Sequence, residues 1–559
     1  MEIQAETLAL LEWDRLGEQV AGFAGSCLGA SLCQPLQLAS SLAEAQRRQL
    51  ETAELLALDG LAEGGLSFQG VTDHSNTVQL CSKGGCASAN DLLQLAETLA
   101  AARRLRRQID DPELRPVTTA LLEGLRTLPE LEQQLRFAIE EGGRVADRAS
   151  PPLAGLRRQL QSQRQERQNR LRELMRRWAN QLQDSVIAQR HGRPVLAVKA
   201  GAAGSLQGQV HDSSASGNTL FIEPQAVVGL GNRIAELEGQ EREEERRVLR
   251  QLSASVAEEE GSLMAMQHCL AQLDLGLARA RYGAWLGAVK PILGSPGWQL
   301  KDLRHPLLMW QERQQAGSPV VPVSLQIEAP LRVVAITGPN TGGKTVTLKS
   351  LGLATLMARA GLFLPCSGTP QLPWCEAVLA DIGDEQSLQQ NLSTFSGHVR
   401  RIARILEALR NLGDAPVPAL VLLDEVGAGT DPSEGAALAT ALLRHLAEQV
   451  QLSVATTHFG ELKALKYDDT RFENASVEFD EVSLRPTYRL LWGIPGRSNA
   501  LAVARRLGLS EDVLGGAEQL LDEQGTSSVN TVISGLEEQR QRQQEAAEEA
   551  AALLMRAEL

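Results

Sequence analysis

The segment from Arg332 to Thr345 constrains the fold of this chain most strongly. The mostly apolar run Arg332-Val-Val-Ala-Ile336 is followed closely by Gly338-Pro-Asn-Thr-Gly-Gly-Lys-Thr345. A continuous apolar run is typical of a strand buried on both faces of a parallel sheet. Glycines let backbone N–H groups approach an anion, and a following helix adds the favourable partial charge of its N-terminus. The segment therefore predicts a strand, a phosphate-binding loop and a helix, which is the Walker A arrangement.

The Walker A arrangement assigns a role to its residues. Lys344 would reach the β- and γ-phosphates of ATP, and the Thr345 hydroxyl would ligate Mg²⁺. ATP and Mg²⁺ are therefore the expected cofactors. The residues predicted to bind ATP are Gly338, Pro339, Asn340, Thr341, Gly342, Gly343, Lys344 and Thr345.

Two adjacent acids follow a second apolar run. Ala419-Leu-Val-Leu-Leu423 leads directly into Asp424 and Glu425, about 80 residues after Lys344. Two acids after a buried strand could be an ordinary strand end. Downstream of a Walker A segment they match the second half of an ATPase site. Asp424 is predicted to hold the metal, and Glu425 to polarise the attacking water.

Two further motifs extend this predicted site. Gly427-Ala-Gly-Thr-Asp431-Pro432 could be a plain glycine-rich loop, but in ABC-type ATPases this place holds the D-loop, which passes between two ATPase domains. Leu452-Ser-Val-Ala-Thr456 predicts a third strand, and His458 follows it. A lone histidine is more often structural than catalytic. In ABC-type ATPases, however, the end of the strand next to the one that carries Asp424 is the switch position, which senses the γ-phosphate. Glu425 and His458 are therefore the predicted catalytic residues.

Outside the α/β region, composition favours long helices. The 559 residues exceed the usual size of one domain several times, and aromatic residues make up only 3%. Leu, Ala, Gln, Glu and Arg are plentiful, and their side chains lose little rotamer freedom in a helix. Apolar residues at helical spacing from Leu92 to Ile109 predict one such helix. The stretch from Leu536 to Leu559 is rich in glutamine and glutamate and also reads as helical.

A lever and clamp are predicted in the middle of the chain. A helix from about Pro152 to Gln183 has apolar residues every three or four positions and carries eight arginines against two glutamates. That arginine run is either a solvated helix face or a face that contacts nucleic acid. A second helical stretch is expected from about Val227 to Ala284. Strands are expected between these helices at Val195–Val198, Leu206–His211 and Thr219–Ile222.

Charge, cysteines and hydropathy exclude other classes of protein. The net charge of −14 argues against a protein that coats nucleic acid indiscriminately. Seven scattered cysteines predict reduced thiols and neither a disulfide frame nor a zinc site. No apolar run is long enough to span a membrane, and the first residues lack the pattern of a signal peptide. A cytoplasmic location is expected.

The motifs together resemble the MutS-type ABC ATPases, and the MutS-two branch in particular. The resemblance spans nearly the whole chain. It rests on Thr337–Thr345, Asp381-Ile-Gly-Asp-Glu-Gln386, Leu392-Ser-Thr-Phe-Ser396 with His398, and Leu423–Pro432. The segments Val198-Lys199 and Gly208–Pro224 resemble the clamp of that branch, and Arg304-His305-Pro306 and Gly493–Ala504 resemble the segments that flank its ATPase core.

The resemblance implies a homodimer with composite nucleotide sites. In MutS-type ATPases the Ser-Thr-Phe segment contacts the nucleotide held by the partner subunit, which makes Ser393 and Thr394 the signature residues that act in trans, although Ser393 could also cap a helix. Asp431 takes the D-loop role. The implied activity is Mg²⁺-dependent hydrolysis of ATP that drives the lever arms.

The partner of the clamp stays open between two polyanions. The branch is associated with branched DNA and suppression of homologous recombination, and with collided ribosomes, where it acts as a rescue factor through rRNA. A structural ABC ATPase that organises chromosomes is the alternative. The chain starts in helices without the wedge domain of mismatch-repair relatives, and Leu559 lies inside the expected coil. We therefore expect either a truncated protein that lacks the small MutS-related nuclease domain or a fragment of a longer protein.

The predicted fold is multidomain α plus α/β. Its expected divisions are an N-terminal helical core at 1–150, a lever helix at 151–190, a β clamp at 191–225, a return lever helix and core at 226–300, an ABC ATPase domain at 301–515, and the start of a C-terminal coiled coil at 516–559.

Overall fold

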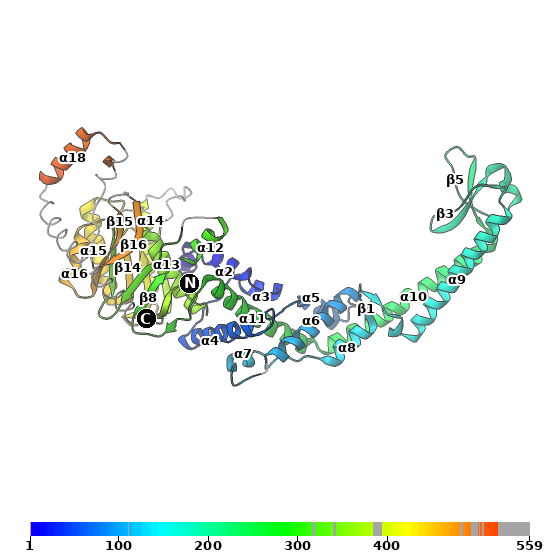
Figure 1. Ribbon diagram of the computed structural model, residues 1–559, viewed down its shortest axis with the longest axis horizontal. Coiled ribbons are helices and arrows are strands. Elements are labelled where there is room, and N and C mark those ends of the chain that lie inside the picture. The colour runs from blue at the N-terminus through cyan, green and yellow to red at the C-terminus, as the bar shows by residue number, and fades with distance from the viewer. Residues whose placement is uncertain are drawn as a thin grey trace, which may run out of the picture.

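A computed structural model describes residues 2–109, 111–315, 319–338, 343–383, 394–480, 485–493, 501, 504–505 and 508–523. The molecule is elongated (Figure 1). A mixed α/β unit lies at one end, a group of helices follows it, and a pair of long helices carries a small sheet to the other end.

The α/β unit is built on a six-stranded sheet. The strand order is β12-β13-β14-β10-β15-β16, and only β16 runs antiparallel to its neighbour. The three apolar runs in the sequence lie in β10, β13 and β14, as predicted. The strands are β10 (Val333–Thr337), β12 (Ala377–Asp381), β13 (Val417–Leu423), β14 (Val450–Thr456), β15 (Phe472–Asp480) and β16 (Arg485–Trp492).

Alternate residues of each parallel strand enter two different cores, because side chains alternate between the faces of a sheet. Val334 and Ile336 of β10 face one core together with α13, whereas Val333 faces the other core with α14 and α15. Helices therefore cover both faces, which explains why the strands read as continuous apolar runs. The helices of this unit are α12 (Pro306–Gln315), α13 (Lys344–Arg359), α14 (Thr394–Arg410), α15 (Pro432–Gln449), α16 (Glu461–Asp468) and α18 (Glu511–Glu523).

A second sheet of four strands lies beside the first. Its order is β7-β11-β8-β9, and Trp492 of β16 donates a hydrogen bond from Nε1 to the carbonyl of Ser324 in β9 (2.9 Å). This contact joins the edges of the two sheets. The strands are β7 (Ile292–Leu293), β8 (Trp298–Leu303), β9 (Val323–Ile327) and β11 (Ser367–Leu372).

The helical group consists of eight short or medium helices from the N-terminal quarter of the chain and the long helix α11 (Glu260–Leu286). The apolar residues from Leu92 to Leu105 lie on α6 and are buried, as their spacing predicted. The short strands β1 (Ile139–Glu140) and β2 (Arg144–Val145) form a hairpin after these helices. The eight helices are α1 (Glu2–Leu10), α2 (Trp13–Ala21), α3 (Cys27–Leu32), α4 (Leu42–Leu61), α5 (Ser75–Ser82), α6 (Ala89–Gln108), α7 (Pro116–Leu121) and α8 (Pro129–Ala138).

Two long helices and a small sheet form what we call the arm, residues 151–258. Helix α9 (Pro151–Arg177) leads out and α10 (Gln225–Glu258) returns, and the sheet at the tip has the order β3-β4-β6-β5. The helix predicted to reach Gln183 ends earlier, because Leu182 to Arg190 form β3, which pairs with β4. The predicted return helix is broken at Glu259 between α10 and α11. The other tip strands are β4 (Arg193–Lys199), β5 (Gly208–Ser213) and β6 (Thr219–Pro224).

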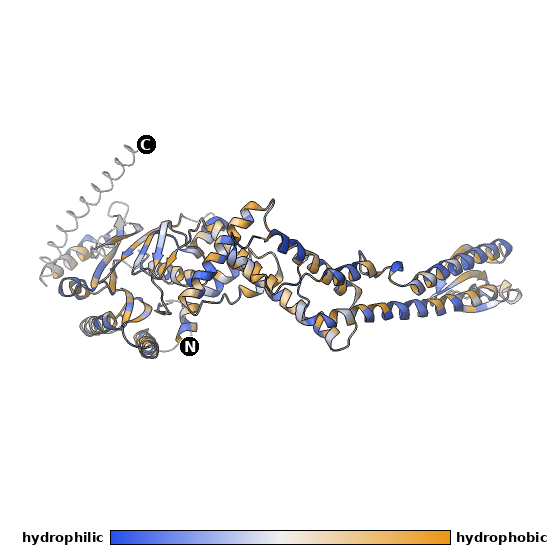
Figure 2. Ribbon diagram, turned by 90° about the horizontal axis from the view of Figure 1, so that it is seen from below, coloured by the Kyte–Doolittle hydropathy of each residue, from blue (hydrophilic) through white to orange (hydrophobic). Residues whose placement is uncertain are grey.

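Ion pairs occupy about half of the arginines on α9. Arg157 contacts Asp147, Glu241 and Glu245, and is only 9% exposed. Arg164 pairs with Glu238 of α10, whereas Arg170 and Arg177 both pair with Glu173 on their own helix. Hydrophilic residues dominate the paired helices in Figure 2. The arginine run therefore serves in part to join α9 to α10.

Candidate nucleotide site

The candidate site lies at the carboxyl ends of the parallel strands. In sheets of this kind, ligands bind outside these ends, where the loops that follow the strands converge. Here β10 leads to Gly338, β13 leads to Asp424, and β14 leads to His458. Hydrogen bonds join these loops to one another, as described below, so residues that are far apart in the sequence form one site.

The loop between β10 and α13 holds Lys344 in a buried position. Gly338 and Gly343 have φ of 129° and 89°, which L side chains rarely adopt. Lys344, the first residue of α13, is 2% exposed and donates from Nζ to the carbonyl of Gly338 (2.9 Å). The predicted ligands Pro339, Asn340, Thr341 and Gly342 lie outside the described residues.

The charge of Lys344 is poorly compensated. Burial lowers the pKa of its ammonium group to about 8, although Glu425 and Asp424 act in the opposite direction. Among the described residues no carboxylate forms an ion pair with it, and its second neighbour is the His458 Nε2 atom at 3.2 Å. A buried cation without a paired anion is costly. The site therefore favours an anionic ligand such as a phosphate chain.

Asp424 lies between two hydroxyl groups. Thr345 donates from Oγ1 to Asp424 Oδ2 (2.7 Å), and Thr456 donates to Asp424 Oδ1. The Thr456 hydroxyl also accepts the backbone N–H of Glu425 (2.8 Å). Thr456 therefore orients both acids, a role that sequence reasoning missed. Its position directly before Thr457 and His458, at the end of a buried strand, is the signal that could have indicated it.

Thr345 and Asp424 suit a magnesium ion. Mg²⁺ prefers hard oxygen ligands and is usually held by one or two protein groups together with substrate phosphates. The Thr345 hydroxyl and the Asp424 carboxylate supply two such oxygens side by side, and Asp424 is only 7% exposed. The donor set therefore fits the predicted metal.

Glu425 and His458 face each other at the mouth of the site. Glu425 Oε1 lies 3.5 Å from His458 Nε2, and both side chains remain partly exposed. Glu425 has a φ of 48°, an unusual backbone conformation for a residue with a side chain. Strained conformations of this kind concentrate at functional sites. The structure thus brings both predicted catalytic residues beside Lys344.

Asp431 has a clear local role. Its side chain caps α15 by accepting the backbone N–H groups of Ser433 (3.0 Å) and Glu434 (3.2 Å). Asp431 is therefore placed at a helix N-terminus, and its predicted D-loop role stays a prediction. Of the two signature residues, Thr394 begins α14, whereas Ser393 lies outside the described residues.

A network behind the site was not predicted from the sequence. Asp381 of β12 is 1% exposed, and its carboxylate contacts His398 Nδ1 (2.9 Å) and Arg401 (2.7 Å) on α14. The contact with Asp381 raises the pKa of His398. The Asp381 carbonyl accepts the backbone N–H of Asp424 (2.7 Å). Arg401 also pairs with Glu6 of α1, so the first helix of the chain is tied to α14.

Tyr488 is a further residue that sequence reasoning missed. It lies on β16 with a φ of 61°, and a Cβ atom added to Gly343 would come within 2.8 Å of its ring. The ring therefore lies against the phosphate-binding loop. The sequence signal that could have drawn attention to Tyr488 is the rarity of tyrosine, because the chain has only three.

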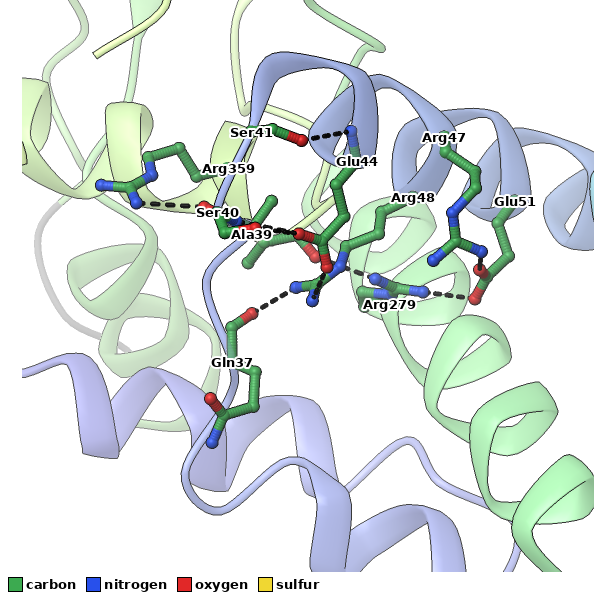
Figure 3. A network of polar contacts seen from close by, with 11 residues as sticks. Gln37, Ala39, Ser40, Ser41, Glu44, Arg47, Arg48, Glu51, Arg279 and Arg359 are labelled. Carbon is green, nitrogen blue, oxygen red and sulfur yellow. Dashed lines mark hydrogen bonds and ion pairs between the residues drawn. The ribbon is translucent and has the colours of Figure 1, made fainter. Parts of the chain in front are cut away.

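The far end of α13 is fixed to the helical group, and Figure 3 shows two of the contacts there, between Arg359 and Ala39 and between Arg279 and Glu51. Four consecutive carbonyls are bound there. Gln49 donates to Ala358 O (3.1 Å), and Thr52 donates to Gly361 O (2.8 Å). The Ala39 N–H donates to Arg359 O (3.2 Å), and Arg279 of α11 donates to Ala360 O (2.9 Å). Arg279 also pairs with the buried Glu51 of α4. The helix that begins at Lys344 thus ends where hydrogen bonds attach it to α4 and α11.

The described part of the chain contains no group of three or more His, Cys, Asp or Glu side chains arranged to hold a metal ion. No helix there is long and apolar enough to cross a membrane.

The fold and the site together define a P-loop ATPase of the ABC type. The family model for MutS domain V matches residues 334–524, which include these strands and loops. The chain is 50% identical over 580 residues to Endonuclease MutS2 of Synechocystis sp., covering all of this chain and 70% of the relative. Endonuclease MutS2 of Symbiobacterium thermophilum is 43% identical over 538 residues, covering 96% of this chain and 66% of the relative.

A third relative, Endonuclease MutS2 of Shouchella clausii, is 41% identical over 539 residues, covering 95% of this chain and 67% of the relative. This chain belongs to the MutS2 family, as the sequence resemblance predicted. It spans about two thirds of the length of these relatives.

Proposed function

We propose that this chain forms an ATP-hydrolysing homodimeric clamp that binds branched DNA and suppresses homologous recombination. The observation that carries the proposal is that one helix, α13, connects the nucleotide site to the helices that lead to the arm. Buried Lys344 begins α13, and the end of α13 is fixed to α11, which directly follows the returning helix of the arm. A change at the nucleotide site therefore has a continuous path of packed helices to the arm.

Each residue of the site has a separate role in the hydrolysis of ATP. Water attacks the γ-phosphorus, a new P–O bond forms, and the bond to the bridging oxygen breaks to release ADP. Glu425 accepts the proton of that water, and His458 contacts the γ-phosphate. Lys344 supplies positive charge for the phosphate chain. Mg²⁺, held by Thr345 and Asp424, would neutralise part of the phosphate charge.

We divide the chain as its sequence predicts, into a helical core, an arm with a β clamp and an ATPase domain at 301–515. Ser393 and Thr394 would complete the site of the partner subunit. This arrangement is supported by the position of α14, which begins at Thr394 and is held beside the site by Arg401 and Asp381.

A complementation experiment tests the composite site. Lys344→Ala and Ser393→Arg variants are each expected to be inactive, whereas a mixture should regain part of the turnover, because a heterodimer holds one intact site. Phosphate release is the measurement, and two differently tagged chains show whether heterodimers form. Heterodimers without recovered turnover would contradict the trans role of Ser393.

The target of the clamp is tested by parallel binding. Branched DNA, linear duplex and collided ribosomes are offered to the full chain with and without ATP, and retention is measured. Preferential binding to branched DNA supports the proposal. Preferential binding to ribosomes would replace it with the rescue function. A structural chromosome-organising role is disfavoured, because the 34 residues of α10 reach only about 50 Å.

We also propose that residues 1–559 hydrolyse ATP without cutting nucleic acid and without preference for mismatched duplexes. The name of the relatives includes "endonuclease", and that name is theirs. The test is incubation with labelled mismatched, branched and single-stranded substrates and Mg²⁺ or Mn²⁺. Cleavage that follows the protein through purification would disprove it.

A further inference from the structure

A basic hollow lies at the base of the arm, away from the nucleotide site. It has a volume of about 590 Å³ and lies between the end of α6, helix α8 and the turn before α9. Helix α8 packs on the arm through Gln134, which donates to Ser255 Oγ of α10 (3.2 Å). The residues that line the hollow include Arg103, Arg107, Glu132, Arg136, Phe137 and Arg148.

Three of the four guanidinium groups are held in place. Glu132, which is 7% exposed, accepts two hydrogen bonds from Arg103 (both 3.0 Å) and pairs with Arg136 at 3.3 Å. Arg148 donates to the carbonyls of Phe137 (2.7 Å) and Arg136 (3.3 Å) at the end of α8. These contacts fix the positions of the guanidiniums, so little side-chain entropy is lost when a ligand binds.

The positive charge of the hollow is not neutralised. Glu132 is the one acid in its lining, and Glu140 lies 4.0 Å from Arg148. Four guanidiniums therefore face at most two carboxylates. Among the described contacts Arg107 has no partner at all. A locally positive surface on a chain of net charge −14 attracts a polyanion specifically to that place.

Phe137 adds an aromatic surface to the hollow. Its side chain is 55% exposed in a chain with only nine phenylalanines, and the Arg148 guanidinium lies 5.7 Å from the ring centroid. Arginines that bind phosphates and an exposed ring that stacks on a base are the combination by which proteins bind single strands. A duplex has no unstacked base to offer to such a ring.

We infer that this hollow binds an unpaired DNA strand, with phosphates on Arg103, Arg107, Arg136 and Arg148 and one base on Phe137. The inference rests on the proposed binding of branched DNA, whose junctions expose unpaired nucleotides, and it names the part of that DNA which the base of the arm recognises. The ATP site and the arm tip take no part in this contact.

The test is fluorescence anisotropy of the full chain with a labelled 20-nucleotide oligothymidine, in rising salt. Arg107→Gln should weaken binding and reduce the salt slope by about 0.7, the value for one phosphate contact on a single strand. Phe137→Ala should weaken binding by about fivefold or more, whereas Phe137→Trp should retain it. Arg107 and exposed Phe137 carry no buried contacts that would endanger folding.

Matched controls separate this contact from general charge effects. Arg410→Gln removes an exposed arginine at the end of α14, and Leu114→Ala removes an apolar side chain that is 70% exposed. Both should bind as the unaltered chain does. Unchanged binding by the Arg107 and Phe137 variants overturns the inference, as does an equal loss of linear duplex binding or tighter binding of the equivalent RNA.

The outcomes also separate this inference from the proposed function. If the chain binds branched DNA but not the oligothymidine, only the inference that the hollow binds an unpaired strand is disproved. If the chain hydrolyses ATP but binds neither kind of DNA, both the single-strand site and the proposed DNA clamp are disproved, whereas the proposed ATPase activity stands.

Discussion

The nucleotide site and the arm use charged residues in opposite ways. At the nucleotide site Lys344 is buried, at 2% exposure, and among the described residues it forms no ion pair with a carboxylate. Along the arm the charges are mostly exposed and paired, as with Arg233 and Glu236, whose side chains are 48% and 54% exposed. Unpaired buried charge is costly and prepares a site for a ligand, whereas exposed pairs contribute little stability. The comparison separates residues that bind and react from residues that keep two helices together.

The largest expected effects follow from changes at the nucleotide site. Lys344→Ala should abolish ATP binding, because the phosphate chain loses its buried counter-charge. Glu425→Gln should keep binding but lower turnover by about 10²-fold or more, since the amide cannot accept a proton. Nucleotide binding and phosphate release are measured separately. A Glu425→Gln chain that turns over at the normal rate would remove Glu425 from the role of base.

The pH dependence of ATP binding tests whether Lys344 is as poorly compensated as its burial indicates. Its pKa in the folded chain is about 8, below the ordinary value of 10.5 for a lysine. Above pH 8 the free site loses its proton, so ATP affinity should fall, by up to about tenfold per pH unit. The matching stability cost of the buried cation is present below pH 8 and is relieved as the pH rises from 8 to 10.5.

A fluorescent nucleotide measures this dependence in the Glu425→Gln background. Lys344→Arg, if it binds, stays charged and should lose the decline between pH 8 and 10. An unaltered decline in that variant would show that another group titrates.

Arg157 differs from most charged residues of the arm, because its side chain is buried like that of Lys344. It is 9% exposed and contacts three acids. Arg157→Ala should destabilise the base of the arm by about 1–2 kcal/mol, since Glu241 and Glu245 lose their partner. Hydrogen exchange of α9 and α10 is the measurement. Protection that stays unchanged would show that apolar contacts alone hold these helices together.

The smallest effect is expected at an exposed pair. Arg233→Ala removes the contact with Glu236 at 2.6 Å and should change the free energy of unfolding by about 0.5 kcal/mol or less. The same hydrogen-exchange experiment compares it with Arg157→Ala. A loss as large as that at Arg157 would contradict the distinction between the two kinds of ion pair.

Much of the nucleotide site was readable from the sequence, because its signals are local. The apolar runs of β13 and β14 end beside Asp424 and His458, and that of β10 leads into the loop before Lys344, so pattern and chemistry lie close together in the chain. Family membership followed from the same segments and is confirmed by the relatives. In the arm, the apolar spacing predicted the helices but missed β3, because Leu182 continues the helical spacing and only its pairing with Val198 makes it a strand.

The tertiary structure alone decided the contacts between residues distant in the chain. Thr456 orients Asp424, and Arg279 binds the end of α13. The position of Thr456 in the sequence indicates that it lies near the site, but which residues these two side chains contact is decided by the fold. Two of the eight arginines on α9, Arg157 and Arg164, proved to be structural only because α10 lies beside them. Spacing along a chain reports which residues share a face of one element. Which elements meet at that face depends on burial and pairing across the whole fold. The same packing decides which charged side chains have a partner of opposite charge.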